Sequence, residues 1–208
     1  MKQMGSIATI AAVLLLISLP AWAQKSGVIG TVHDINGNGC ISCHAPHNGA
    51  AATGATDQGS GRTLLWDRNF SSTSFGTYDS PTLNNKAVEV GGAVQPAATD
   101  ARLYSVLCMS CHDGVTTQSV IGPTSTKAVG NPTSSFGLQN DHPINMTYDT
   151  VQDPGLQALA SVTAAGLKLF GANNSMQCAS CHDVHNNANT KFMRTSNTGS
   201  GLCLTCHR

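Results

Sequence analysis

The chain contains few charged and few aromatic residues for its length. Of its 208 residues, 11% are charged and 5% are aromatic, and the formal net charge at pH 7 is zero. A chain without net charge is not expected to bind nucleic acid or an anionic membrane surface. With so few aromatic side chains, a conventional apolar core would be thin for this length. We therefore expect something other than ordinary side-chain packing to fill much of the interior.

Long apolar runs are also scarce, and the longest lies at the N-terminus. Residues 7–19 are apolar, Lys2 precedes them, and Ala21-Trp22-Ala23 fits a small-residue cleavage site. The run is too short for a comfortable membrane span, and no later segment is long enough. We expect residues 1–23 to be a removed signal peptide and the mature chain, from residue 24, to be exported without a membrane span.

Cysteine, by contrast, occurs eight times, always within a Cys-x-x-Cys-His motif. The four motifs, numbered 1 to 4 in chain order, pair Cys40 with Cys43, Cys108 with Cys111, Cys178 with Cys181, and Cys203 with Cys206, and end in His44, His112, His182 and His207. Two thiols at this spacing can form thioethers to the two vinyl groups of one haem, whose iron the adjacent histidine then binds. Neither a disulfide framework nor a four-thiolate zinc site would explain the four histidines. The motifs predict four covalent haem c groups, haems 1 to 4.

The two halves of the mature chain resemble each other around these motifs. Each half contains a histidine close to Ile-Asn, which is His33 in the first half and His142 in the second. A motif comes after it, and three residues after that motif's own histidine stands another one, His47 or His185. A second motif ends each half. We interpret this pattern as a duplicated two-haem module, about 24–115 and 140–208, within a single tetrahaem domain, 24–208.

Secondary structure is weakly signalled. Helical spacing predicts a helix within 156–170, and a short helix is expected over 101–109, leading into motif 2. Segments rich in Gly, Ser, Thr and Asn are predicted to be loops: 48–62, 71–85 and 116–140. The predicted fold is mostly coil with a few short α-helices and little or no β-sheet, wrapped around a stacked chain of haems.

Four histidines lie outside the motifs, namely His33, His47, His142 and His185. Four spare histidines for four irons, at equivalent places in the repeat, predict that each iron has two histidine ligands. Methionine is the rival ligand, but Met109 lies between its own two cysteines, and Met146, Met176 and Met193 lie at non-equivalent positions, so packing is the more economical role. Irons with two histidines have no open position, so an electron carrier is expected rather than an enzyme such as a multihaem reductase.

The partner of each spare histidine is harder to predict. His47 is tied to the proximal side of haem 1, because it follows His44 by three residues, and is expected to ligate haem 2. By the same argument His185 is expected to ligate haem 4. Two alternatives remain for the others. Either His33 and His142 ligate the first haem of their own modules, or His142 ligates haem 1 and His33 ligates haem 3 of another protomer. The second arrangement is head to tail and produces a filament unless it closes into a ring.

With these residues in view, the chain resembles the doubled-CxxCH multihaem cytochromes. It resembles more closely the tetrahaem outer-surface cytochromes of metal-reducing bacteria, which polymerise into extracellular conductive filaments. The resemblance rests on the segments CHAPHN, LLW, LCMSCHDG, DHPI, CHDVHN, KFMR and CLTCH. It implies a continuous haem stack and one axial histidine crossing each subunit boundary, a role carried over here to His33.

Electron conduction toward external acceptors is the leading hypothesis. The expected partners are further copies of the chain in a homopolymer, and other redox cytochromes or extracellular acceptors, at the outer cell surface. The alternative is a monomeric tetrahaem shuttle in the periplasm with the same cofactors.

Overall fold

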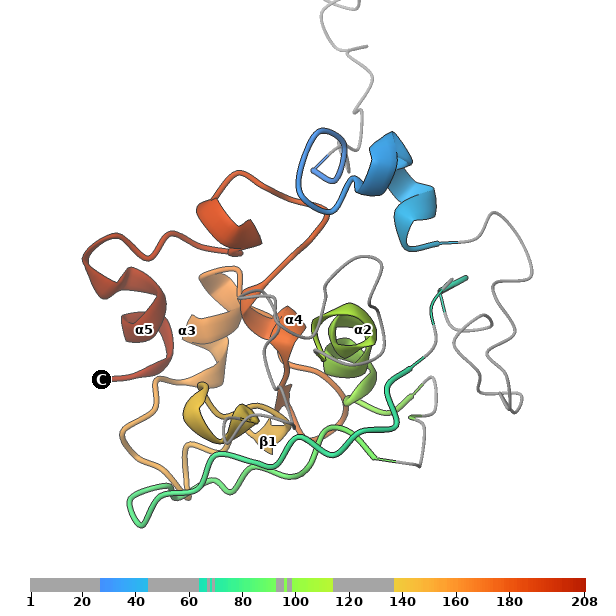
Figure 1. Ribbon diagram of the computed structural model, residues 1–208. Coiled ribbons are helices and arrows are strands. Elements are labelled where there is room, and N and C mark those ends of the chain that lie inside the picture. Colours follow the sequence, from blue (N-terminus) through green and yellow to red (C-terminus); the bar gives the residue numbers. More distant parts are fainter. Residues whose placement is uncertain are drawn as a thin grey trace, which may run out of the picture.

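The computed structural model describes residues 27–44, 64–66, 68, 70–92, 96, 99–113 and 137–208. Most of these residues are irregular, and the helices are short (Figure 1). In chain order the elements, with η denoting a 3-10 helix, are η1 (Ile35–Gly37), η2 (Gly39–Ser42), α2 (Leu103–His112), η4 (Leu138–Asn140), β1 (Met146–Thr147), α3 (Leu159–Ala164), β2 (Ser175–Met176), α4 (Cys178–Cys181), η5 (Thr190–Phe192), η6 (Thr198–Ser200) and α5 (Gly201–Cys206). The prediction of mostly coil with a few short helices is confirmed for this part of the chain. The predicted signal peptide and the predicted loop 48–62 lie outside it.

Both helices expected from the sequence are present, with different bounds. α2 starts two residues later than expected and continues to His112, so it contains all of motif 2. α3 occupies only the middle of the predicted helix 156–170. It ends at Ala164 because Gly166 follows with a φ of 93°, which glycine adopts without a Cβ clash. The chain then runs on to Phe170, which forms an isolated bridge with Ser175.

The only sheet within the described residues is a pair of two-residue strands. β1 and β2 are antiparallel, with Met146 opposite Met176 and Thr147 opposite Ser175. The pairing joins the segment after His142 to the segment just before motif 3. It therefore positions a spare histidine and a motif from the same half relative to each other.

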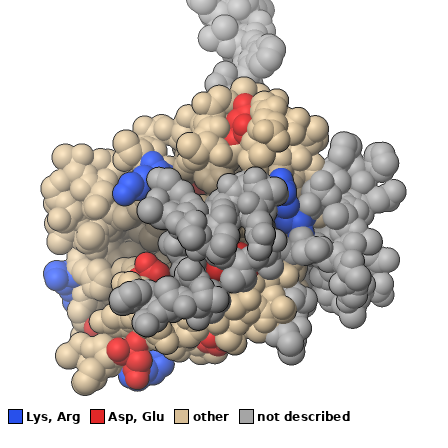
Figure 2. Space-filling view, viewed as in Figure 1, with Lys and Arg blue, Asp and Glu red and all other residues tan. Residues whose placement is uncertain are grey.

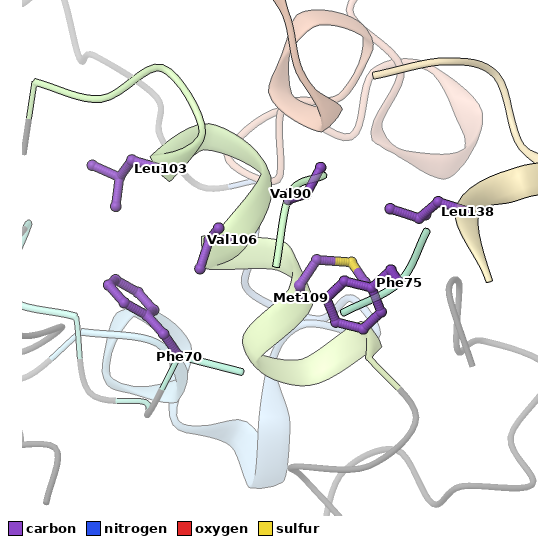
Figure 3. Packing of buried hydrophobic residues seen from close by; sticks show 7 residues of the cluster. All are labelled: Phe70, Phe75, Val90, Leu103, Val106, Met109 and Leu138. Carbon is purple, nitrogen blue, oxygen red and sulfur yellow. The ribbon is translucent and has the colours of Figure 1, made fainter. Parts of the chain in front are cut away.

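Two apolar clusters hold the helices that carry motifs. The first surrounds α2 and contains Phe70, Phe75, Val90, Leu103, Val106, Met109 and Leu138 (Figure 3). The second lies between α3, β2 and α5 and contains Tyr148, Leu156, Val162, Leu167, Met176 and Cys206. Met109 is completely buried and Met176 almost so, which agrees with the packing role expected for them. Each cluster thus fixes one motif helix in place.

The similarity between the halves extends to unusual backbone conformations. Leu64 and Leu65 have φ values of 58° and 55°, and the matching Lys191 and Phe192 both have 57°. The asparagines of the two His-x-Ile-Asn segments behave alike, with φ of 57° in the first half and 52° in the second. Positive φ is uncommon for residues other than glycine. Its recurrence at corresponding positions means that both halves bend the chain in the same way beside their histidines.

The surface shown in Figure 2 carries scattered charges, and its Lys and Arg side chains do not gather into one patch. Several large apolar side chains are exposed, and two of them lie within motifs: Ile41 is 53% exposed inside motif 1, and Leu204 is 57% exposed inside motif 4. In the part of the chain that the structure describes, no helix is long and apolar enough to cross a membrane.

Candidate haem-ligating site

Backbone carbonyls orient the histidines that end motifs 1 and 3. His44 Nδ1 lies 2.7 Å from the carbonyl oxygen of Leu64, and His182 Nδ1 lies 2.9 Å from that of Lys191. A carbonyl oxygen only accepts hydrogen bonds, so Nδ1 carries the proton in both rings. Nε2 then keeps its lone pair for a metal, as is usual for histidine ligands held by a second hydrogen bond. Both acceptors belong to the residue pairs with positive φ, which explains why this conformation occurs in each half.

Three motif histidines each face one spare histidine. The ring centroids are 6.1 Å apart for His33 and His112, 6.2 Å for His44 and His185, and 6.2 Å for His142 and His207. Two imidazoles on opposite sides of one metal ion, each at a metal–nitrogen bond of about 2.0–2.1 Å, have centroids about 6 Å apart. The spacing therefore fits an iron between each pair, and the chemistry of the donors fits haem.

The histidines that are neighbours in the structure are not the pairs expected from sequence, and the ligand assignments themselves stay predictions. His185 lies beside the histidine of motif 1, whereas the sequence argument assigned it to haem 4. His33 lies beside the histidine of motif 2 of its own chain, and His142 beside that of motif 4, which agrees with neither alternative. Distance along the chain carries no information about how the two halves pack. His47 lies outside the described residues, so its predicted role is untested.

His33 is placed for ligation by a partly apolar environment. Its ring centroid lies 4.7 Å from that of Phe192, and its Nδ1 is buried without a hydrogen-bond partner among the described residues. Burial, with a smaller effect from the neighbouring His112 and His182, lowers the pKa of His33. The shift favours the neutral imidazole, which is the form that binds metal.

The turn that carries His33 is held by the next residue. Asp34 accepts hydrogen bonds from the backbone N–H groups of Gly30, at 2.8 Å, and Gly39, at 2.6 Å. These two bonds lower the pKa of Asp34, because they stabilise its ionised form. The carboxylate thereby connects the start of the segment to motif 1.

A buried polar cluster locks motif 2 to motif 3. Ser105 Oγ donates to Gln177 Oε1 at 2.6 Å and accepts from the Cys178 N–H at 2.9 Å. Ser105 and Gln177 are almost fully buried. Sequence reasoning missed both residues. The available signal was position, since Ser105 is one helical turn before Cys108, and Gln177 directly precedes motif 3 and caps α4 in a capping box.

Cysteines of consecutive motifs are neighbours in space. A hydrogen bond between the Cys108 and Cys178 thiols, together with burial, raises the pKa of Cys108 well above its ordinary value. Burial and the nearby Cys111 raise the pKa of Cys43.

Cysteines of motifs 3 and 4 are also neighbours in space. Burial and the nearby Cys206 raise the pKa of Cys181 to about 11. Cys181 also packs against the second apolar cluster, which contains Cys206. Motif 1 thus adjoins motif 2, motif 2 adjoins motif 3, and motif 3 adjoins motif 4.

Comparison with known proteins identifies one matching family. The doubled CXXCH motif family matches residues 171–208, the segment that contains motifs 3 and 4. No curated protein matches the chain. The match indicates covalently bound haem c and supports a multihaem c-type cytochrome.

Proposed function

We propose that the protein is a tetrahaem c-type cytochrome that transfers electrons, and that it is not an enzyme. The observation that carries this proposal is the set of three histidine pairs, each made of one motif histidine and one spare histidine at the spacing of two ligands on one iron. Haem iron with two histidine ligands supplies one-electron redox chemistry at low potential. The polypeptide contributes ligands, attachment cysteines and a partly dry environment.

The order of the motifs in space supports transfer along the chain. Because cysteines of motifs 1 and 2, 2 and 3, and 3 and 4 are neighbours, the groups attached to them would lie edge to edge in chain order. The exposed apolar residues Ile41 and Leu204, each between the two cysteines of its motif, fit a surface that an attached macrocycle covers. His182 would complete haem 3 with His47, the spare histidine left by the count.

Assembly distinguishes two forms of this function. The sequence resemblance supports export to the outer surface, a head-to-tail homopolymer, and other redox cytochromes or external acceptors as partners. One observation favours the second candidate, a monomeric periplasmic shuttle. His33, the histidine proposed to cross between protomers, lies 6.1 Å from His112 of its own chain.

Haem stoichiometry and spin state test the common function. We expect four haems per chain by mass spectrometry and pyridine haemochrome assay, all low-spin by electron paramagnetic resonance. Fewer than four haems would overturn the tetrahaem assignment, and a high-spin haem in the unmodified protein would overturn two histidine ligands on every iron.

Electron microscopy of the same sample tests assembly, with His33→Ala beside it. Filaments that disappear in His33→Ala would establish the shared ligand. Uniform monomers would establish the shuttle.

A further inference from the structure

We propose that haem 1 bridges the two halves of the chain, with its covalent attachment and proximal ligand in the N-terminal half and its second axial ligand, His185, in the C-terminal half. This inference rests on the proposed function, because it requires haem at motif 1. It assigns His185 to a different haem from the one that sequence spacing indicates.

The first argument is the arrangement of the two rings. The His44 and His185 centroids are 6.2 Å apart and the ring planes are inclined by only 21°. His44 turns its Nδ1 toward the Leu64 carbonyl oxygen, and His185 turns its Nδ1 toward Asp183 Oδ1, at 3.5 Å. The His44 Nδ1 is therefore hydrogen-bonded, the His185 Nδ1 lies on the side of a carboxylate, and Nε2 is the nitrogen of each ring that is left for a metal.

Close backbone packing brings His185 to the N-terminal segment. A Cβ on Gly27 would overlap the carbonyl oxygen of His185 and would lie 2.6 Å from the backbone nitrogen of Asn186. Only glycine permits such an approach. The neighbouring Val28 is buried, and the ring of Phe192 contacts His33 further along the same segment. In Figure 1 this blue segment lies next to the orange loop that follows α4.

His185 itself is fixed by the C-terminal half. Its N–H donates to Asp183 Oδ1 at 3.1 Å, and the other oxygen of Asp183 pairs with Arg194 at 3.0 Å. Arg194 Nε donates to the carbonyl oxygen of Ala179, inside motif 3. The ligand is thus anchored beside motif 3 while it faces motif 1.

Motif 4, the expected destination of His185, has another partner. His142 lies 6.2 Å from His207 by ring centroids, and β1 and β2 hold the segment after His142 next to motif 3. A ligand for haem 4 is therefore available without His185. It follows that haem 1 reaches its final ligation only after both halves have folded together.

The experiment places His185→Ala in three haem-loaded backgrounds. These are the unmodified chain, a chain without haem 1 (Cys40→Ser with Cys43→Ser), and a chain without haem 4 (Cys203→Ser with Cys206→Ser). High-spin iron is quantified by electron paramagnetic resonance, and total haem by pyridine haemochrome. We expect His185→Ala to create one high-spin haem per chain in the unmodified and haem 4-deficient backgrounds, and none in the haem 1-deficient background. The reverse dependence on haems 1 and 4 would overturn the proposal.

A second variant keeps every histidine and cysteine. Gly27→Ala separates the N-terminal segment from His185, so we expect a high-spin signal that disappears when haem 1 is removed. Gly155→Ala is the matched control, since its Cβ would meet only the Asp153 carboxylate, at 3.1 Å, and it should stay low-spin. A low-spin Gly27→Ala protein would contradict the bridge. A parent chain with fewer than four haems would instead overturn the proposed function.

Discussion

Replacing Ser105 with alanine tests whether buried hydrogen bonds hold motifs 2 and 3 together. Ser105 is fully buried on α2, and its hydroxyl makes two bonds to the start of α4, donating to Gln177 Oε1 and accepting from the Cys178 N–H. Alanine has nearly the same size, so the substitution removes the hydroxyl with little change in packing. The variant therefore isolates the polar contribution.

The expected cost follows from the groups left behind. The Cys178 N–H loses its hydrogen-bond acceptor at a site with little access to water, and a buried unsatisfied group costs about 1–3 kcal/mol. Gln177 Oε1 loses one donor but keeps the bond of the capping box, so about 0.5–1.5 kcal/mol is added, the usual net value of one hydrogen bond. The free energy of unfolding should fall by about 1.5–4.5 kcal/mol in total.

Guanidinium unfolding of the haem-loaded protein, followed by far-ultraviolet circular dichroism, measures the loss. Ser196→Ala is the control, because that hydroxyl donates to Thr198 Oγ1 at 3.0 Å and accepts from the Thr198 N–H at 3.2 Å in an exposed place where water can replace it, so its removal should change stability by less than about 0.5 kcal/mol. If Ser105→Ala unfolds at the same denaturant concentration as Ser196→Ala, the buried cluster does not hold the motifs together.

Three further predictions concern a ligand, a partly buried ion pair and a buried tyrosine, with Lys86→Met as the control for the ion pair. His33→Met should raise the reduction potential of one haem, measured by spectroelectrochemistry, because methionine ligation favours the reduced iron; an unchanged set of potentials would contradict ligation by His33. Arg194→Met should destabilise the protein by about 1–3 kcal/mol in thermal unfolding, since it leaves Asp183 and the Ala179 carbonyl without their partner. Lys86→Met, which breaks the exposed pair with Asp79, should destabilise the protein much less, because water screens that pair; equal losses in the two variants would refute the argument. Burial raises the pKa of Tyr148 to about 12, so the protonated form stabilises the fold below the ordinary pKa of about 10, and this contribution is lost as the pH rises through 12. In denaturant titrations at increasing pH, Tyr148→Phe should therefore lose less stability at alkaline pH than the unmodified chain. If the stabilities of the two proteins fall in parallel, Tyr148 makes no such contribution.

Local features of the fold were largely predictable. The helix leading into motif 2 and the scarcity of sheet follow from composition and spacing, and the buried Met109 and Met176 are packing residues as expected. The predicted helix within 156–170 is shorter because Gly166 interrupts it, a turn conformation that apolar spacing alone does not reveal. The Ser105–Gln177 cluster was not predictable, since its members are 72 residues apart and neither is unusual in its local sequence.

The sequence by itself determined the motifs, eight cysteines in four Cys-x-x-Cys-His units, and it predicts that the four spare histidines complete four irons. Covalent attachment depends on the spacing of two cysteines and a histidine within five residues, and that spacing can be read directly from the sequence. Only the tertiary structure decided which spare histidine faces which motif. His185 lies beside His44 because Gly27 lets the N-terminal segment approach the loop after motif 3, a contact between residues far apart in sequence. Pairing of this kind depends on how the halves pack, and local sequence does not encode it.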